Sequence, residues 1–195
     1  MLRLMLILMA VLLLAGCAGT SPPTHFYALE TADAPVKVAS MPELSLGLGP
    51  VILPDTLDRP QIVARTAAFR VELAEFHRWA GDLNANLSRL LVGRLMGALG
   101  TDRVFLHPWA RHRKLDYQAR VDLLRFDGNL GGEAELTGTW TLLDGDGRRE
   151  LYLEAFSIKG RVSGAEHRDM VATLSALAVQ LADRIATGVA GHAPR

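Results

Sequence analysis

Residues 82–100, DLNANLSRLLVGRLMGALG, form the segment in which the spacing of apolar side chains changes from every second residue to a helical period. Asp82 is a suitable N-cap and Gly100 is a suitable stop for a helix. Gly93 and Gly97 lie one helical turn apart, which would let this helix approach a sheet closely. The segment therefore predicts an amphipathic helix whose apolar face consists of Leu83, Leu87, Leu90, Leu91, Leu95 and Leu99.

The residues before this helix alternate between apolar and polar types, as β-strands do. The alternation is clearest in residues 44–48 and 69–73, and shorter extended segments are expected at 25–29 and 61–65. Residues 30–42 contain two prolines and predict a loop. The first half of the chain is therefore expected to supply several strands.

The residues after the helix predict an antiparallel meander of three strands, at 117–126, 134–142 and 151–159. The apolar phase switches at Leu124, which indicates a β-bulge. Residues 144–147 read Asp-Gly-Asp-Gly, a strong signal for a hairpin turn. These strands are expected to pair in chain order.

A second amphipathic helix is expected at about 166–187, closed by Gly188, with residues 189–195 as a disordered tail. The whole pattern predicts a single α/β domain over residues 25–188. Its mixed β-sheet would carry the antiparallel meander, and two long amphipathic helices would pack on the sheet, one on each face, in α/β/α layers.

The N-terminus has the features of a secretory signal: Arg3, then an apolar run at 4–14, then small residues. About 11 residues span only about 16 Å as a helix, too short for a bilayer core of about 30 Å. The ending Leu14-Ala15-Gly16-Cys17 resembles a bacterial lipoprotein signal. It predicts removal of residues 1–16 and lipid attachment at Cys17, which is the only cysteine, so no internal disulfide can form.

Residues 17–24 are expected to form the lipidated cysteine and a flexible tether, of which the seven residues after Cys17 reach about 25 Å at most. The residue after the cysteine is Ala18 rather than Asp, which favours the outer membrane. Removal of the signal leaves 20 basic and 21 acidic residues, because Arg3 is lost. This balance provides no field to attract nucleic acid.

The sequence contains no recognisable catalytic or metal-binding pattern. It has no G-x-S-x-G, H-E-x-x-H, Walker or dinucleotide-binding motif, and its six histidines are scattered along the chain. Asp144 and Asp146 do not have calcium-loop spacing, because Arg148 occupies the third ligand position. The chain is therefore predicted to be no enzyme and to bind no metal or cofactor.

Two groups of residues are candidates for contact with a partner or a membrane. Arg111, Arg113 and Lys114 form the densest positive cluster, which would suit lipid phosphates or an acidic partner, or be a solvated loop. Tyr27 could belong to a partner-facing aromatic patch or to a core-packed edge strand. Trp79 could be an interface anchor or could pack as a lid on the sheet.

Four groups of residues together resemble one family of bacterial lipoproteins. Residues 57–63, LDRPQIV, are the most specific, and they include Arg59, a further candidate contact. The others are residues 26–29 (FYAL), residues 49–54 (GPVILP) and residues 78–80 (RWA) with Leu83. The chain is similar, over about 25 to 185, to the PqiC-type lipoproteins, also called ABC-type transport auxiliary lipoproteins.

This resemblance implies a non-catalytic, periplasm-facing lipoprotein of the outer membrane that serves an intermembrane lipid-transport system. The implied partner is a membrane-anchored MCE-domain transport protein that crosses the periplasm. The implied fold is a mixed sheet with helices on both faces, and homo-oligomer formation is left open. The alternative is a lipoprotein that carries lipid in an apolar pocket of its own.

Overall fold

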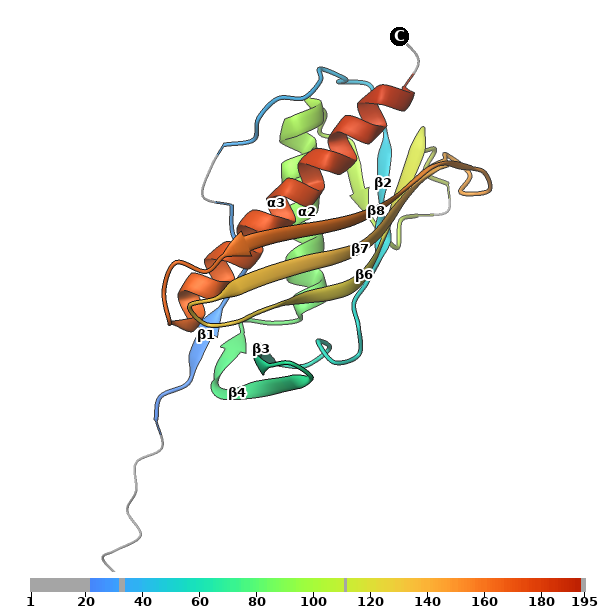
Figure 1. The fold of residues 1–195 in the computed structure, drawn as a ribbon. Helices are drawn as coiled ribbons and strands as arrows, with labels where there is room; N and C mark the ends of the chain where they lie inside the picture. The colour runs from blue at the N-terminus through green and yellow to red at the C-terminus, as the bar shows by residue number, and fades with distance from the viewer. Residues whose placement is uncertain (1–21, 32–33, 111, 194–195) are drawn as a thin grey trace, which may run out of the picture.

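The computed structural model describes residues 22–31, 34–110 and 112–193 (Figure 1). Eight strands form one curled, mixed sheet, and two long helices pack on it, which confirms the predicted mixed α/β class. The elements are β1 (His25–Tyr27), β2 (Leu46–Ile52), β3 (Gln61–Ala67), β4 (Arg70–Trp79), α2 (Leu83–Leu99), β5 (Val104–Leu106), β6 (Tyr117–Gly128), β7 (Glu133–Asp144), β8 (Glu150–Arg161) and α3 (His167–His192).

The centre of the sheet is β6, which has neighbours on both sides. β2 pairs with β6 and β5 in parallel, while β6, β7 and β8 form the antiparallel meander that the sequence predicts. The register shifts between Leu123 and Arg125, where the bulge was expected. The β3–β4 hairpin joins the end of β6 through the pair Ala64–Gly128, and β1 extends it in parallel with β4.

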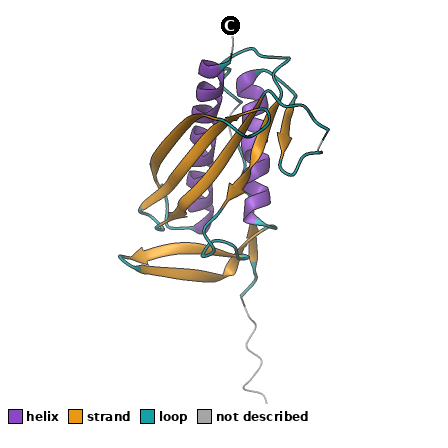
Figure 2. Cartoon of the chain, turned by 90° about the vertical axis from the view of Figure 1, so that its right-hand side faces the viewer, coloured by secondary structure: helices purple, strands orange, loops and turns teal. Residues whose placement is uncertain are grey.

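Both helices lie on the same face of the sheet, so the predicted α/β/α layering is wrong. α3 packs against α2 and against β6, β7 and β8, while α2 packs against β2 and β5. Figure 2 shows the two helices side by side behind the strands. The reason lies in the strands, whose other face carries mostly polar exposed side chains such as Arg120, Asp122, Ser157 and Lys159. Apolar residues such as Leu124 and Leu153 are isolated there and form no continuous stripe for a helix.

The ends of α2 are as predicted, but its glycines play another role. The Asp82 carboxylate accepts a hydrogen bond from the Ala85 backbone N at 2.7 Å, and Gly100 ends the helix with a φ of 62°. A β-carbon on Gly97 would lie 2.1 Å from a side-chain atom of Pro35, so Gly97 admits the 34–42 loop rather than a sheet. Gly93 faces open space.

α3 does not end at Gly188, and that predicted boundary is wrong. The helix continues to His192, so residues 189–192 are ordered helix and Val189 is buried. Gly188 is glycine for a packing reason: a β-carbon there would lie 2.4 Å from the ring of Trp140, which comes from β7. Within the described residues, no helix combines the length and apolar character needed to cross a bilayer.

The domain has two distinct ends (Figure 1). The N-terminal end carries residues 22–24, β1 and the β3–β4 hairpin. The C-terminal end carries the last turn of α3, where the Tyr117 hydroxyl donates a hydrogen bond to the His192 carbonyl. Because the 26 residues of α3 run between the two ends, they are about 39 Å apart at 1.5 Å per residue.

Candidate functional site

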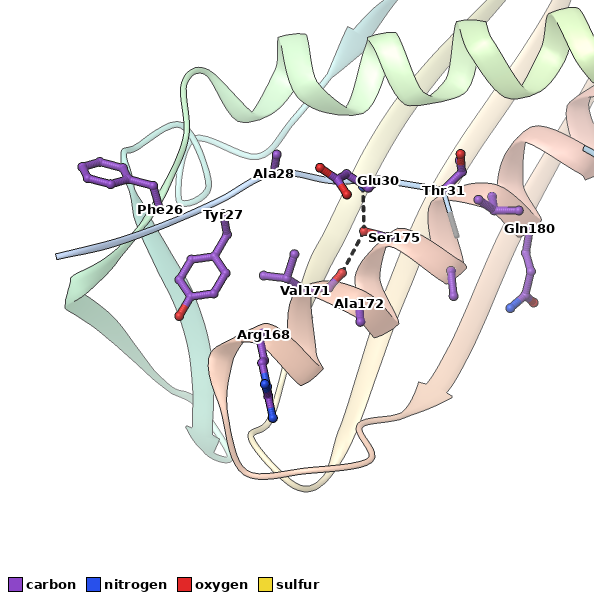
Figure 3. A pocket seen from close by; sticks show the side chains of 12 residues that line it. Phe26, Tyr27, Ala28, Glu30, Thr31, Arg168, Val171, Ala172, Ser175 and Gln180 are labelled. Carbon is purple, nitrogen blue, oxygen red and sulfur yellow. Dashed lines mark hydrogen bonds between the residues drawn. The ribbon is translucent and has the colours of Figure 1, made fainter. Parts of the chain in front are cut away.

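A groove of about 650 Å³ runs between β1 with the residues that follow it and one side of α3 (Figure 3). β1 pairs with β4 alone among the described strands, so its other edge faces this groove. The residues lining the groove are Phe26, Tyr27, Ala28, Glu30, Thr31, Arg168, Val171, Ala172, Ser175, Ala176, Val179 and Gln180.

The width of the groove follows from small side chains on α3. Ala172 and Ala176 are one turn apart, so they leave room where larger residues would close the gap. Ser175 spans the floor, since its hydroxyl donates to the Val171 carbonyl at 2.9 Å and accepts from the Glu30 backbone N at 3.3 Å. The result is an apolar floor with charged residues at the rim, which suits an amphipathic segment.

Tyr27 points into this groove and is tied to a cluster of histidines. Figure 3 shows its ring directed toward α3 and that of Phe26 directed away. The Tyr27 hydroxyl lies 2.8 Å from His77 Nδ1. Burial, together with the negative charge of Glu166, raises the pKa of Tyr27, so this phenol stays neutral at physiological pH.

Three histidines that are far apart in the sequence stack on one another at the N-terminal end. The ring centroids of His77 and His167 are 3.8 Å apart, and those of His25 and His77 are 5.3 Å apart. Sequence reasoning missed this cluster, because it depends on the register of β1 and β4, which puts His25 opposite His77, and on where α3 begins. Among the described residues, no three His, Cys, Asp or Glu side chains are arranged so that they could hold a metal ion.

Tyr27, Arg59 and Trp79, three of the predicted contact residues, come close together. Tyr27 lies opposite Trp79 in the β1–β4 register, and the Trp79 backbone N donates to the carbonyl of Pro60, next to Arg59. Trp79, however, is only 5% exposed and belongs to the core. The alternative in which Trp79 packs on the sheet therefore holds, and its side chain offers almost no area to a partner.

The basic loop lies elsewhere, toward the C-terminal end of the domain. Arg113 and Lys114 are exposed, and the Arg113 guanidinium lies 3.8 Å from the centroid of the Phe105 ring. The Lys114 carbonyl accepts from the Ser45 hydroxyl, which fixes the end of the loop beside β2. Arg111 and Cys17 lie outside the described residues.

A partly buried charge cluster attaches the β3–β4 hairpin to the body of the domain. Asp127 on β6 accepts hydrogen bonds from Arg65 on β3 at 2.9 Å and from Arg125 at 2.7 Å, and Arg125 also pairs with Glu135. Burial pushes the pKa of Asp127 up, but the hydrogen bonds from the two arginines outweigh it and leave the pKa below its ordinary value. The carboxylate therefore stays charged and holds the hairpin in place.

Comparison with known proteins places this arrangement in a family. Residues 27–186 match the family described as ABC-type transport auxiliary lipoprotein component. The chain is 26% identical over 182 residues to the intermembrane transport lipoprotein PqiC of Escherichia coli, covering 93% of this chain and 94% of PqiC. The protein of the same name from Shigella flexneri matches equally well.

Solved structures share the fold at low sequence identity. A crystal structure of a protein from Xanthomonas campestris has a TM-score of 0.72 and 16% identity, over 85% of this chain and 94% of the other. A crystal structure of an uncharacterized protein has a TM-score of 0.71 and 20% identity, over 86% of this chain and 99% of the other. Because the family match spans nearly all the described residues, this chain belongs to the ABC-type transport auxiliary lipoprotein component family.

Proposed function

We propose that this lipoprotein is the non-catalytic outer-membrane component of an intermembrane lipid-transport system, and that it docks an MCE-domain partner there. Lipid on Cys17 holds the domain at the membrane, facing the periplasm. The observation that carries the proposal is the layout of the domain: residues 22–24 enter its N-terminal end, and the C-terminal end lies about 39 Å away along α3. The tether that the sequence predicts would therefore hold the N-terminal end near the membrane. Such a domain can meet a long partner but cannot itself join two membranes.

The family supports the transport role and the absence of catalysis. PqiC, the relative from Escherichia coli, is named an intermembrane transport lipoprotein, and its similarity extends over 93% of this chain. An auxiliary component of a transport system needs surfaces for its partners rather than a reaction centre. The geometry of the N-terminal groove, with small alanines and a charged rim, is that of a binding surface.

The basic loop of Arg111, Arg113 and Lys114 is the surface that we assign to the partner. It lies toward the end of the domain that faces away from the tether, where Lys114 bonds to Ser45 near the start of β6. Charges on lipid headgroups are screened beyond about 8 Å at physiological ionic strength. The loop is therefore too far from its own membrane to contact the lipid phosphates, and an acidic surface of a partner protein is the occupant that we assign to it.

Cross-linking in cells followed by purification of the lipidated chain tests this docking role. The unmodified chain should recover the MCE-domain protein. Charge reversal by Arg113→Glu with Lys114→Glu should lower recovery by about fivefold or more, because like charges would then face each other. Arg120→Glu, an exposed arginine on the open face of the sheet, is the matched control. Recovery of no MCE protein from cells that make one would refute the proposal.

Cys17→Ser tests the anchor separately. Without the thiol no lipid can be attached, so the variant should move from the membrane fraction to the soluble periplasmic fraction. One acyl chain binds a membrane only marginally, while two or more hold firmly, so the shift should be nearly complete. A variant that stays in the outer-membrane fraction would show that something other than Cys17 holds the protein there.

The alternative function, a lipoprotein with its own lipid pocket, has one observation in its favour. The groove between β1 and α3, at about 650 Å³, falls within the size range of ligand pockets. Its rim carries Glu30, Arg168 and Gln180, which suit a polypeptide segment better than acyl chains. Phospholipid that co-purifies with the chain and disappears in Ala176→Trp, which fills the groove, would favour this alternative.

A further inference from the structure

The tip of the β3–β4 hairpin exposes an aromatic side chain in an unfavourable backbone conformation. Phe69 has a relative exposure of 104% and a φ of 63°. Two-residue hairpin turns favour Gly, Asn or Asp at positive φ, and a bulky residue there is a clear outlier. Water is a poor environment for this apolar ring, and the turn that displays it adopts a conformation that a Gly, Asn or Asp would adopt at lower cost.

Other apolar side chains are exposed on the same hairpin and on the strand β1 that extends it. The hairpin tip, residues 67–71, reads Ala-Ala-Phe-Arg-Val and contains a single charge, Arg70. Val71 is 45% exposed. Phe26 on β1, which pairs with β4, is 65% exposed, and its ring is directed away from α3 (Figure 3). This end of the domain therefore exposes several large apolar side chains, and Phe69 is the most accessible of them.

The position of the hairpin relates this tip to the membrane. Figure 2 shows the hairpin lying across the N-terminal end of the domain, beyond the ends of the two helices. Residues 18–24 reach at most about 25 Å, so the bilayer that holds the lipid on Cys17 must lie close to this end. The bonds of Arg65 to Asp127 fix the hairpin to β6, so the tip is held in a defined place.

We propose that the hairpin tip inserts Phe69 into the interface of the bilayer to which the chain is anchored, as a second attachment point. The inference rests on the proposed anchor at Cys17. The phenyl ring lies among the upper acyl chains, and the Arg70 guanidinium stays at the level of the lipid phosphates. A lipid anchor on a flexible tether leaves the domain free to tumble. A second point on a rigid hairpin fixes its orientation, so that the C-terminal end faces away from the membrane.

Spin labelling of the lipidated chain tests the insertion directly. Cys17 is the only cysteine and carries the lipid, so Phe69→Cys adds the one free thiol for a nitroxide. The matched control is Leu124→Cys, which is 70% exposed on the open face of the sheet. In vesicles of phosphatidylethanolamine and phosphatidylglycerol, the label at 69 should collide with dissolved oxygen more than with a water-soluble nickel chelate. The label at 124 should show the reverse.

The outcomes separate this inference from the proposed function. If the protein floats with the vesicles but the label at 69 is as accessible to nickel as the label at 124, the anchor stands and the inserted tip is wrong. If the chain does not float, both are wrong. If the label at 69 becomes shielded only when the MCE partner is added, the tip is a protein contact and the inference is overturned.

A second measurement avoids the label. In the unlipidated Cys17→Ser chain, Phe69→Ser should lower the partition coefficient onto the same vesicles by about tenfold, because it removes a buried phenyl group. Phe69→Trp should preserve binding, and Leu124→Ser should leave it unchanged. All of these side chains are exposed, so the melting temperature should stay near that of the parent. Equal binding by Phe69→Ser and its parent would overturn the inference.

Discussion

His167 begins α3 inside the stack of histidine rings, and its surroundings disfavour its charged form. Burial, together with nearby His77, lowers the pKa of His167 from its ordinary value of 6.5, although Glu72 opposes the shift. Because the unfolded chain then binds protons more readily, stability is fully present above about pH 6.5 and falls as the pH drops toward the lower pKa of the folded state.

His167→Gln should therefore flatten the loss of stability between about pH 7 and pH 5. The measurement is urea unfolding at a series of pH values, compared with the unmodified chain. His112→Gln, in an exposed loop, is the control and should leave the slope as it is. A slope that persists unchanged in His167→Gln would show that other groups cause it.

Gly188 offers a second test at the level of one residue. Gly188→Ala places a methyl group 2.4 Å from the Trp140 ring, which is fully buried and hydrogen-bonded to Glu154. Overpacking of this kind should destabilise the domain by about 1–3 kcal/mol. Gly191→Ala, three residues later in α3, meets nothing within 4 Å and should be neutral or slightly stabilising. Thermal unfolding of both variants measures the difference, and equal melting temperatures would contradict the packing argument.

At the level of whole elements, one ion pair connects the two helices. Arg94 on α2 is 4% exposed and donates two hydrogen bonds to Asp183 on α3, at 2.7 and 2.8 Å. The same guanidinium donates to the Ala34 carbonyl at 3.0 Å. The interaction therefore joins both helices and the loop that covers them.

Asp183→Ala removes a carboxylate from a buried guanidinium and should destabilise the domain by about 3 kcal/mol. Arg184→Ala removes the neighbouring, more exposed pair with Glu154 and should change stability by about 0.5 kcal/mol or less. Chemical unfolding measures both. A similar effect for the two variants would mean that the buried pair contributes no more than a surface pair.

The elements were predictable from sequence wherever the cause is local. Asp82 and Gly100 set the ends of α2 through neighbours a few residues away, so their types alone indicate the boundaries. Gly188 could not be interpreted this way. The residue that requires glycine there is Trp140, which lies 48 positions earlier in the chain, on β7. The apolar face of each helix could likewise be predicted from the spacing of its apolar residues. Which face of the sheet a helix covers could not, because that choice depends on polar residues in strands far along the chain.

At the level of the whole molecule, the candidate contact residues divide between the two ends. The sequence does not show how Tyr27, Trp79 and the basic loop lie relative to one another. In the structure Tyr27 lies in β1 at the N-terminal end, and Arg113 lies toward the opposite end. The histidine stack and the exposed Phe69 were also out of reach, because neighbouring strands and a turn conformation create them. The periodicity of apolar residues predicts single helices and strands. Which surface residues share an end of the domain depends on how those elements pack together.

Under the proposed function, this division predicts that docking depends on the length of the segment between Cys17 and β1. Insertion of 20 Gly and Ser residues after Ala18 would raise the root-mean-square reach of the tether from about 15 Å to about 29 Å, since flexible chains extend about 5–6 Å times the square root of their length. The lipid on Cys17 would still hold the protein in the membrane fraction. The domain, however, would no longer be kept against the bilayer, and the effective concentration of its C-terminal end at the partner would fall.

Cross-linking to the MCE partner should therefore decrease several-fold in the extended variant while membrane fractionation stays the same. An insertion of equal length after Arg148, where Arg148 and Arg149 are exposed between β7 and β8, is the control for insertion itself. If the chain with the extended tether cross-links to the partner as efficiently as the original chain does, the short tether has no role in docking. The proposed insertion of Phe69 adds a further expectation. An inserted Phe69 would still hold the extended chain at the bilayer, so cross-linking to the partner would decrease less. Phe69→Ser in the extended chain should then give the full decrease in cross-linking.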